Sequence, residues 1–421
     1  MTAPAEDNSD GAVLPPPGGS QAPASLQLGR LFHLGGLAAL LLATYELARP
    51  TAESMFLSAH GAAALPWAWL GVAVGAALVS TAYARAVARY PLGVVIGAAS
   101  SLSAALFVLL VFLRREGFPA APFLTYVVKD LYIVVLLESL WAVANASWRL
   151  QHARWLYGLF PLFGSAGSLF GGQAAARLTE RFGTENALLA VAPALIVFGW
   201  LARSLDAPTR VAGTDPVRLG AQLTRLARSR YLQLLAITIG LVQLVVAFVD
   251  AGFNARLESL GLTEDARTVA IAGVYQYTTW AAAGLQLLAG PLLAALGVTR
   301  ILVGVPVLVM ASLVGMATVG SWHVTAFAKV MGKALDYSLF RAAKELVYLP
   351  LEYAEKTEGK GLVDMLTYRV AKGAASALLL VLAAFGLSQA TPWVAVGLGV
   401  LWTAAAIRLA AAYRSRVGDS P

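Results

Sequence analysis

Long apolar stretches recur along the whole chain, and short polar or basic segments separate them. A stretch of roughly 20 apolar residues is long enough for an α-helix to cross about 30 Å of hydrocarbon. The pattern therefore predicts an all-α polytopic membrane protein with twelve transmembrane helices. The predicted spans cover residues 31–48, 65–84, 91–113, 121–146, 156–176, 186–204, 231–253, 268–295, 299–318, 322–350, 361–386 and 391–411.

The composition agrees with this pattern and excludes several classes of protein. The 421 residues are 58% hydrophobic and only 13% charged, whereas soluble proteins average about 25% charged residues. The absence of cysteine rules out disulfides and thiolate metal sites. The net charge of +8 is dispersed between apolar spans, which favours loops on an anionic membrane leaflet over nucleic-acid binding. We expect the lipid bilayer as a partner and no nucleic acid.

The polar segments divide the chain into two halves of six spans. Residues 1–28 are rich in Pro, Gly, Ser and Ala and lack Lys and Arg, so they predict a disordered tail and not a signal peptide. We expect six-helix bundles at 29–204 and 231–412, a basic cytoplasmic linker at 205–230 and a C-terminal tail at 413–421. A 6+6 layout with a long basic central loop is typical of the major facilitator superfamily, which is built from repeats.

Basic residues predict the orientation, because cytoplasmic loops carry an excess of Lys and Arg. Both termini are expected in the cytoplasm. We also expect the protein to be a monomer and to lie in a bacterial inner membrane. The loops on that side hold Arg85, Arg89, Arg149, Arg154, Arg210, Arg218, Arg225, Arg228, Arg230, Arg300, Lys356 and Lys360. The opposite loops hold Arg114, Arg115, Arg177, Arg181, Arg256 and Arg267.

A weak internal repeat relates spans four and five to spans ten and eleven. Each pair has a polar-studded helix, a short basic loop and a helix rich in Gly, Ala and Ser. Small residues let membrane helices approach closely, and corresponding segments in two halves indicate a central binding site. Shared membrane composition is the alternative explanation.

One stretch, residues 329–372, is too charged to be an ordinary lipid-facing helix. It holds six of the seven lysines, whereas the basic residue elsewhere is almost always arginine. Lysine is a compact charge on a rotatable stem, suited to binding and releasing phosphate. We expect this stretch to line a polar cavity inside a transporter of a polyanion. The alternative is an amphipathic helix on the membrane surface.

Ionisable side chains inside spans cost about 2.5–3.5 kcal/mol each on insertion scales, so they usually face a cavity or a partner. Lys and Arg in such a cavity suit a phosphate-bearing anion, and carboxylates there hold the cations or form gating pairs. Buried helix-to-helix pairs without a ligand are the alternative for any single residue. The candidates for substrate binding are Arg49, Lys129, Lys333, Lys360, Arg369 and Lys372. The candidates for gating or coupling are Asp130, Glu138, Asp250, Asp336 and Asp364.

Four motifs resemble a known family of transporters. The segments are WAVAN at 141–145 followed by FPLFG at 160–164, DYSLFRAAKELVYLPL at 336–351, KTEGKGLVDML at 356–366 followed by AKGAAS, and, more loosely, ELARPTAES at 46–54. In these segments the chain is similar to the ATP/ADP translocases of plastids and intracellular bacteria, whose architecture is major-facilitator-like.

That resemblance implies a nucleotide exchanger with functional Lys and acidic residues in the membrane. The implied lysine is Lys360, followed by Asp364, and the implied acidic positions are Asp250 and Asp130. The family's first-span lysine falls on Ala52 here, which removes a charge from the expected site.

We therefore expect exchange of nucleotides of the ATP/ADP type, or of related phosphorylated anions, by alternating access. A proton-coupled major-facilitator transporter of another small solute, with Asp250 or Glu138 as proton carrier, is one alternative. A non-transporting scaffold or sensor is another. No GxxxxGK[ST] phosphate loop is present and the four histidines are scattered, so we expect no enzyme, no catalytic residue, no cofactor and no metal.

Overall fold

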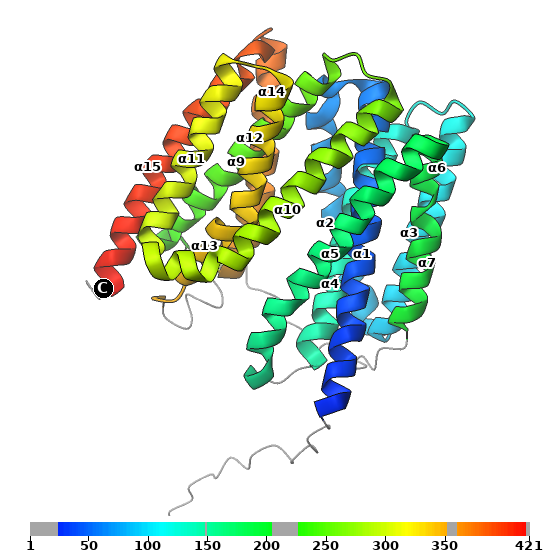
Figure 1. The fold of residues 1–421 in the computed structure, drawn as a ribbon, viewed down its shortest axis with the longest axis horizontal. Coiled ribbons are helices and arrows are strands. Elements are labelled where there is room, and N and C mark those ends of the chain that lie inside the picture. Colours follow the sequence, from blue (N-terminus) through cyan, green and yellow to red (C-terminus); the bar gives the residue numbers. More distant parts are fainter. Residues whose placement is uncertain (1–23, 148–149, 204–225, 352–359, 418–421) are drawn as a thin grey trace, which may run out of the picture.

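The computed structural model describes residues 24–147, 150–203, 226–351 and 360–417, which are almost entirely helical. Figure 1 shows two groups of helices, α1–α7 and α9–α15, which we call the N-terminal group and the C-terminal group. The N-terminal group contains α1 (Ala24–His60), α2 (Leu65–Arg89), α3 (Leu92–Arg115), α4 (Ala121–Ser147), α5 (Leu150–Phe182), α6 (Thr184–Leu189) and α7 (Val191–Ala202), with a short 3-10 turn at Ala62–Ala64.

The C-terminal group follows the same pattern of long helices and tight connections. It contains α9 (Arg230–Glu258), α10 (Glu264–Leu296), α11 (Val298–Thr318), α12 (Trp322–Leu335), the π-helix η2 (Asp336–Phe340), α13 (Arg341–Val347), α14 (Lys360–Ala384), the 3-10 turn η4 (Ser388–Ala390) and α15 (Thr391–Val417). The side chains of Ser229, Thr263 and Ser321 accept a backbone N–H at the start of α9, α10 and α12, which satisfies an otherwise unpaired donor.

Eight segments in the described part of the chain are long and apolar enough to cross a membrane. They are Leu31–His60, Ala62–Arg89, Leu92–Arg115, Thr184–Ala202, Arg230–Glu258, Glu264–Leu296, Val298–Thr318 and Ser388–Val417. The other four predicted spans fall on α4, α5, α12 to α13, and α14. The expectation of an all-α, multi-pass membrane protein is confirmed.

Several predicted boundaries differ from the observed helices. The first helix begins at Ala24, inside the tail predicted at 1–28, because Ala, Leu and Gln in this segment favour helix. It also continues to His60, well past the predicted end at residue 48, since neither Arg49 nor the internal Pro50 ends it. The span predicted at 322–350 is not one regular helix, because a π-helix separates α12 from α13. The last helix extends to Val417, into the predicted tail.

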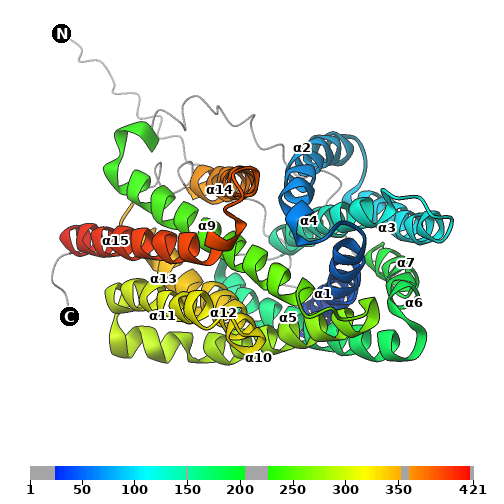
Figure 2. The same cartoon turned by 90° about the horizontal axis from the view of Figure 1, so that it is seen from above.

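Close contact between α1 and α5 depends on small residues. A side-chain carbon added at Gly167 or Gly171 would overlap the backbone of Ala39 or Ala43, so only glycine allows the two helices to approach this closely. The α5 helix also runs beside α10, where a side-chain carbon added at Gly172 would meet the Gln276 side chain. In Figures 1 and 2, α1 and α5 of the N-terminal group meet α10 of the C-terminal group at the boundary between the two groups. Charged side chains meet at this boundary.

Candidate substrate site

The first contribution to the site is a row of charged residues on α1. Glu46, Arg49 and Glu53 are spaced by three and four residues, so they share one face of the helix. The Arg49 guanidinium donates to Glu46 Oε1 at 3.3 Å and lies 3.6 Å from Glu53 Oε1. All three side chains are at most 12% exposed. The arginine is therefore held between two carboxylates of its own helix.

Helix α4 adds a lysine and an aspartate beside this row. Lys129 is 2% exposed, and its Nζ lies 2.9 Å from Asp130 Oδ1 and 3.9 Å from Glu53 Oε1. The same ammonium lies 3.8 Å from the centre of the Tyr126 ring, where a cation is attracted to the aromatic face. The Tyr45 hydroxyl of α1 donates to Asp130 Oδ1 at 3.4 Å. These contacts join α1 to α4.

The C-terminal group contributes one aspartate and two lysines. Asp250 of α9 lies 3.4 Å from Lys329 Nζ and 3.0 Å from Lys333 Nζ, both on α12. The two lysines are one helical turn apart, which places both ammonium groups on the face that meets α9. Lys329 is 1% exposed, and its ammonium also lies 3.7 Å from the centre of the Phe253 ring. The Asp250 carboxylate is thus within salt-bridge distance of two buried ammonium groups.

Tyr275 of α10 connects the two halves of the site. Its hydroxyl lies 3.0 and 2.8 Å from the two carboxylate oxygens of Glu53. The Arg49 guanidinium lies 3.6 Å from the centre of the same ring, and Lys329 Nζ lies 4.8 Å from it. A single buried tyrosine therefore contacts charged residues of both the N-terminal and the C-terminal group.

Taken together, these residues form what we call the central charge network. It consists of four cations and four carboxylates, namely Arg49, Lys129, Lys329 and Lys333 with Glu46, Glu53, Asp130 and Asp250. The charges balance, which lowers the cost of burying them. Such a network can bind a polyanion if the anion's oxygens replace carboxylates around the cations.

The structure brings together five of the residues that the sequence singled out: Arg49, Lys129, Asp130, Asp250 and Lys333. Lys372 of α14 is half-buried, with its Nζ 5.8 Å from the centre of the Trp69 ring. Glu138 is exposed on α4, and Asp336 begins the π-helix after Lys333 with no cation of the described residues within salt-bridge distance. The side chains of Lys360, Asp364 and Arg369 lie outside the described part of the structure.

Glu53 and Lys329 were not among the substrate-binding or gating residues predicted from the sequence, and Tyr275 was considered only as an aromatic candidate for base stacking. Glu53 was missed because the first span was expected to end at residue 48, which left Glu53 in a loop. Its spacing of four residues from Arg49 was the available signal. The spacing of Lys329, Lys333 and Asp336 placed all three on one helix face, but Lys329 was not chosen as a phosphate-binding residue.

A second set of polar contacts joins the two groups at the end of the molecule opposite the described termini, here called the distal end. Arg114 of α3 lies 2.6 Å from Glu264 Oε2 of α10 and 3.3 Å from Glu185. The Thr184 backbone N–H donates to Asp265 Oδ1 at 2.8 Å. The Ser54 hydroxyl donates to the carbonyl of Glu264 at 2.6 Å. In this structure the distal end is closed by contacts between the groups.

Part of the chain, including Lys329 and Lys333, matches a family model. Residues 294–413 match the family model described as TLC ATP/ADP transporter. ADP,ATP carrier protein 1 of Chlamydia muridarum is 32% identical over 91 residues, which are 20% of this chain and 17% of that protein. The chloroplastic ADP,ATP carrier protein 1 of Arabidopsis thaliana is 23% identical over 341 residues, covering 69% of this chain and 54% of that protein. The chain thus spans about half or less of these relatives' length.

Solved structures show the same fold. A mutant of the nucleoside transporter NupG superposes with a TM-score of 0.67 at 13% identity, covering 92% of this chain and 100% of that one. An inward-facing bacterial homologue of the iron transporter ferroportin also gives a TM-score of 0.67 at 13% identity, covering 93% and 100%. The expected resemblance is confirmed: the chain has a major-facilitator-type fold, and its residues 294–413 match the TLC ATP/ADP transporter family.

Proposed function

We propose that this chain is a membrane transporter that exchanges nucleotides of the ATP/ADP type, or related phosphorylated anions, by alternating access. The observation that carries the proposal is the burial of four basic side chains between the two helix groups, where a transported solute would pass. Cationic side chains inside a membrane usually mark a substrate or ion pathway. The similarity to carriers named for ADP and ATP supports a phosphorylated substrate.

The substrate would bind by exchanging with carboxylates. Phosphate oxygens form charge-assisted hydrogen bonds to Arg and Lys that resemble those of a carboxylate. A polyphosphate entering between the groups would bind Arg49, Lys129 and Lys333 in place of the carboxylates that contact them in this structure. The released carboxylates would repel one another and the substrate unless the groups moved, which links binding to a conformational change.

The predicted halves, residues 29–204 and 231–412, would rock against each other around this site. Tyr275 supports this view because it contacts Glu53 and Arg49 of the other group. The ion pair between Arg114 and Glu264 at the distal end would break when the site opens to that side. Exchange would need no hydrolysis, because the carrier would return loaded with a counter-substrate.

The orientation and location remain part of the proposal. The excess of Arg and Lys in the loops beside the termini supports cytoplasmic termini. The distal end would then face the outside of a bacterial inner membrane. A nucleotide binding from the cytoplasm would reach the network from the end that holds the termini.

The test is counterflow in proteoliposomes. Labelled ATP outside should accumulate in vesicles loaded with unlabelled ADP or ATP and not in empty vesicles, with an uncoupler leaving uptake unchanged. Uptake that collapses with the uncoupler and ignores the internal nucleotide would support the proton-coupled alternative. Absence of uptake with every phosphorylated anion loaded would reject the exchanger, and absence of transport of any solute would support a scaffold or sensor.

A further inference from the structure

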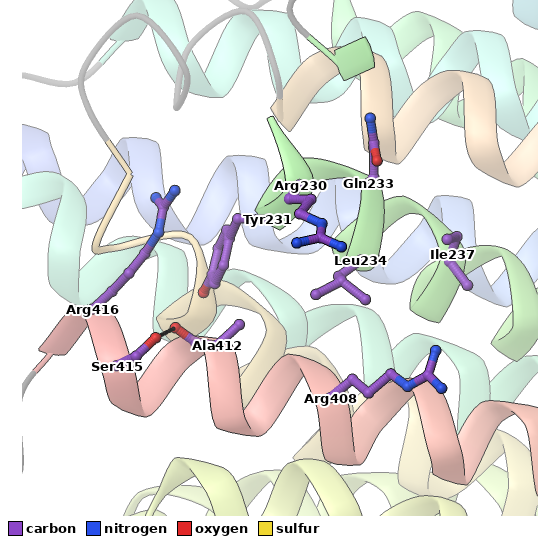
Figure 3. Close-up of a pocket in the computed structure, with 9 residues that line it drawn as sticks. All are labelled: Arg230, Tyr231, Gln233, Leu234, Ile237, Arg408, Ala412, Ser415 and Arg416. Atoms are coloured by element: carbon purple, nitrogen blue, oxygen red, sulfur yellow. Dashed lines mark hydrogen bonds between the residues drawn. The ribbon is translucent and has the colours of Figure 1, made fainter. Parts of the chain in front are cut away.

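A second basic site lies far from the central charge network, between α9 and α15. It is a pocket of about 600 Å³ whose lining includes Arg230, Arg408 and Arg416 and no carboxylate. Figure 3 shows the three arginines around the space between the two helices, with Tyr231 beside Arg416. Because Arg230 begins α9 and Arg416 lies in the last turn of α15, the pocket is at the end of the molecule that holds the described termini.

The pocket is built on fixed groups. The Tyr231 hydroxyl donates to the carbonyl of Val347 at 2.7 Å, and the tyrosine is 3% exposed. The Arg416 guanidinium lies 4.4 Å from the centre of the Tyr231 ring, which orients it over a rigid aromatic face. Arg230 and Tyr231, which line the pocket, belong to the first turn of α9, and the start of a helix favours an anion.

Arg408 is the residue that most needs a ligand. It lies within Ser388–Val417, a segment apolar enough to cross a membrane, and it is exposed. Within the described residues, neither Arg408 nor Arg230 has a carboxylate within salt-bridge distance. An arginine among apolar surface is costly unless an anion meets it or its side chain reaches the interface.

The surroundings point to a lipid and not to a soluble anion. Leu234 and Ile237 form an apolar wall of the pocket on α9, and Ile237 is 53% exposed. Ile407, next to Arg408, is 51% exposed. Exposed aliphatic side chains on membrane helices face hydrocarbon, so the pocket combines a basic rim with a wall suited to an acyl chain.

We propose that this pocket binds one anionic phospholipid, with the phosphate between Arg230, Arg408 and Arg416 and an acyl chain along Leu234 and Ile237. Basic pockets between membrane helices on the cytoplasmic side are suited to anionic headgroups. The site is independent of the transported substrate, since none of its residues belongs to the central charge network.

The test is lipid binding to the purified, delipidated full chain, measured by native mass spectrometry. Phosphatidylglycerol, phosphatidylcholine and inorganic phosphate are the probes. The test variant is Arg230→Ala with Arg408→Ala. The control is Arg89→Ala with Arg300→Ala, which removes the same charge from two exposed positions at the same end. We expect the test variant to lose affinity for phosphatidylglycerol by about tenfold or more, while the control and the weaker binding of phosphatidylcholine stay unchanged.

Arg408→Gln alone, which keeps a long polar side chain, provides a milder second variant and should also weaken phosphatidylglycerol binding. Equal affinity of the test and control variants for phosphatidylglycerol would overturn the proposal. So would displacement of the lipid by inorganic phosphate at equal concentration, because that result would assign the pocket to a free anion.

Discussion

At the scale of single residues, the centre of the molecule is held by charges that neutralise one another. Removing one member of a buried ion pair is more damaging than replacing the whole pair, because a buried charge is left without a partner. Asp250 is the clearest case, since it alone faces both Lys329 and Lys333. Stability and transport should therefore respond differently to single and paired substitutions.

Asp250→Asn should lower the free energy of unfolding by about 3 kcal/mol or more, since two ammonium groups lose their carboxylate. Thermal unfolding in detergent measures this as a lower midpoint. Adding Lys329→Met to the same variant restores equal numbers of cations and carboxylates in the central charge network. This second substitution should recover part of the lost stability. A single variant as stable as the wild type would show that the two ion pairs do not hold α9 to α12.

Tyr275→Phe should weaken exchange while leaving the ring beneath Arg49 in place. The substitution removes the hydrogen bond to Glu53, and a hydrogen bond to a charged group contributes about 1.5–3 kcal/mol. Initial rates of nucleotide uptake measure the effect. Tyr277→Phe is the matched control, because Tyr277 on the same helix is 70% exposed. If Tyr275→Phe and Tyr277→Phe lower the initial rate of uptake equally, the Tyr275 hydroxyl has no specific role in the proposed coupling.

At the scale of elements, close helix contacts position the charged row of α1. Gly167→Ala should lower the free energy of unfolding by about 1–3 kcal/mol, because the added methyl group overlaps the backbone of Ala39. The comparison is Gly273→Ala, where the added carbon meets open space, so its unfolding midpoint should stay the same or rise slightly. The same midpoint in both variants would contradict the close packing of α5 on α1.

The helices themselves were largely predictable, because the apolar length needed to cross a membrane is a strong local signal. The site was predictable only in part. The cost of a charge in a span identified Arg49, Lys129, Asp130, Asp250 and Lys333, but no spacing rule indicates which helix meets which. Tyr275 and Glu53 lie more than two hundred residues apart in the chain. Their contact depends on the packing of α10 against α1, which local pattern does not encode.

At the scale of the whole molecule, closure of the distal end is the feature that the proposed alternating access must reverse. The chain contains no cysteine, so a single Ser54→Cys variant can report access to the buried distal interface. Adding Arg114→Ala should raise the rate of labelling by an impermeant maleimide severalfold, because the ion pair to Glu264 is lost. Ser259→Cys, at an exposed position of the same end, should label equally in both backgrounds. An unchanged labelling rate at Ser54→Cys would mean that Arg114 does not keep this end closed.

The central claim is that buried cations of the network bind the phosphates of the substrate. The most direct measurement is the affinity of the purified protein for adenosine, AMP, ADP and ATP, in the wild type, in Lys333→Gln and in the exposed control Arg300→Gln. The account predicts affinity that rises with the number of phosphates in the wild type and the control, and a flatter series in Lys333→Gln. Equal affinity for adenosine and ATP in the wild type, or an unchanged series in Lys333→Gln, would contradict it.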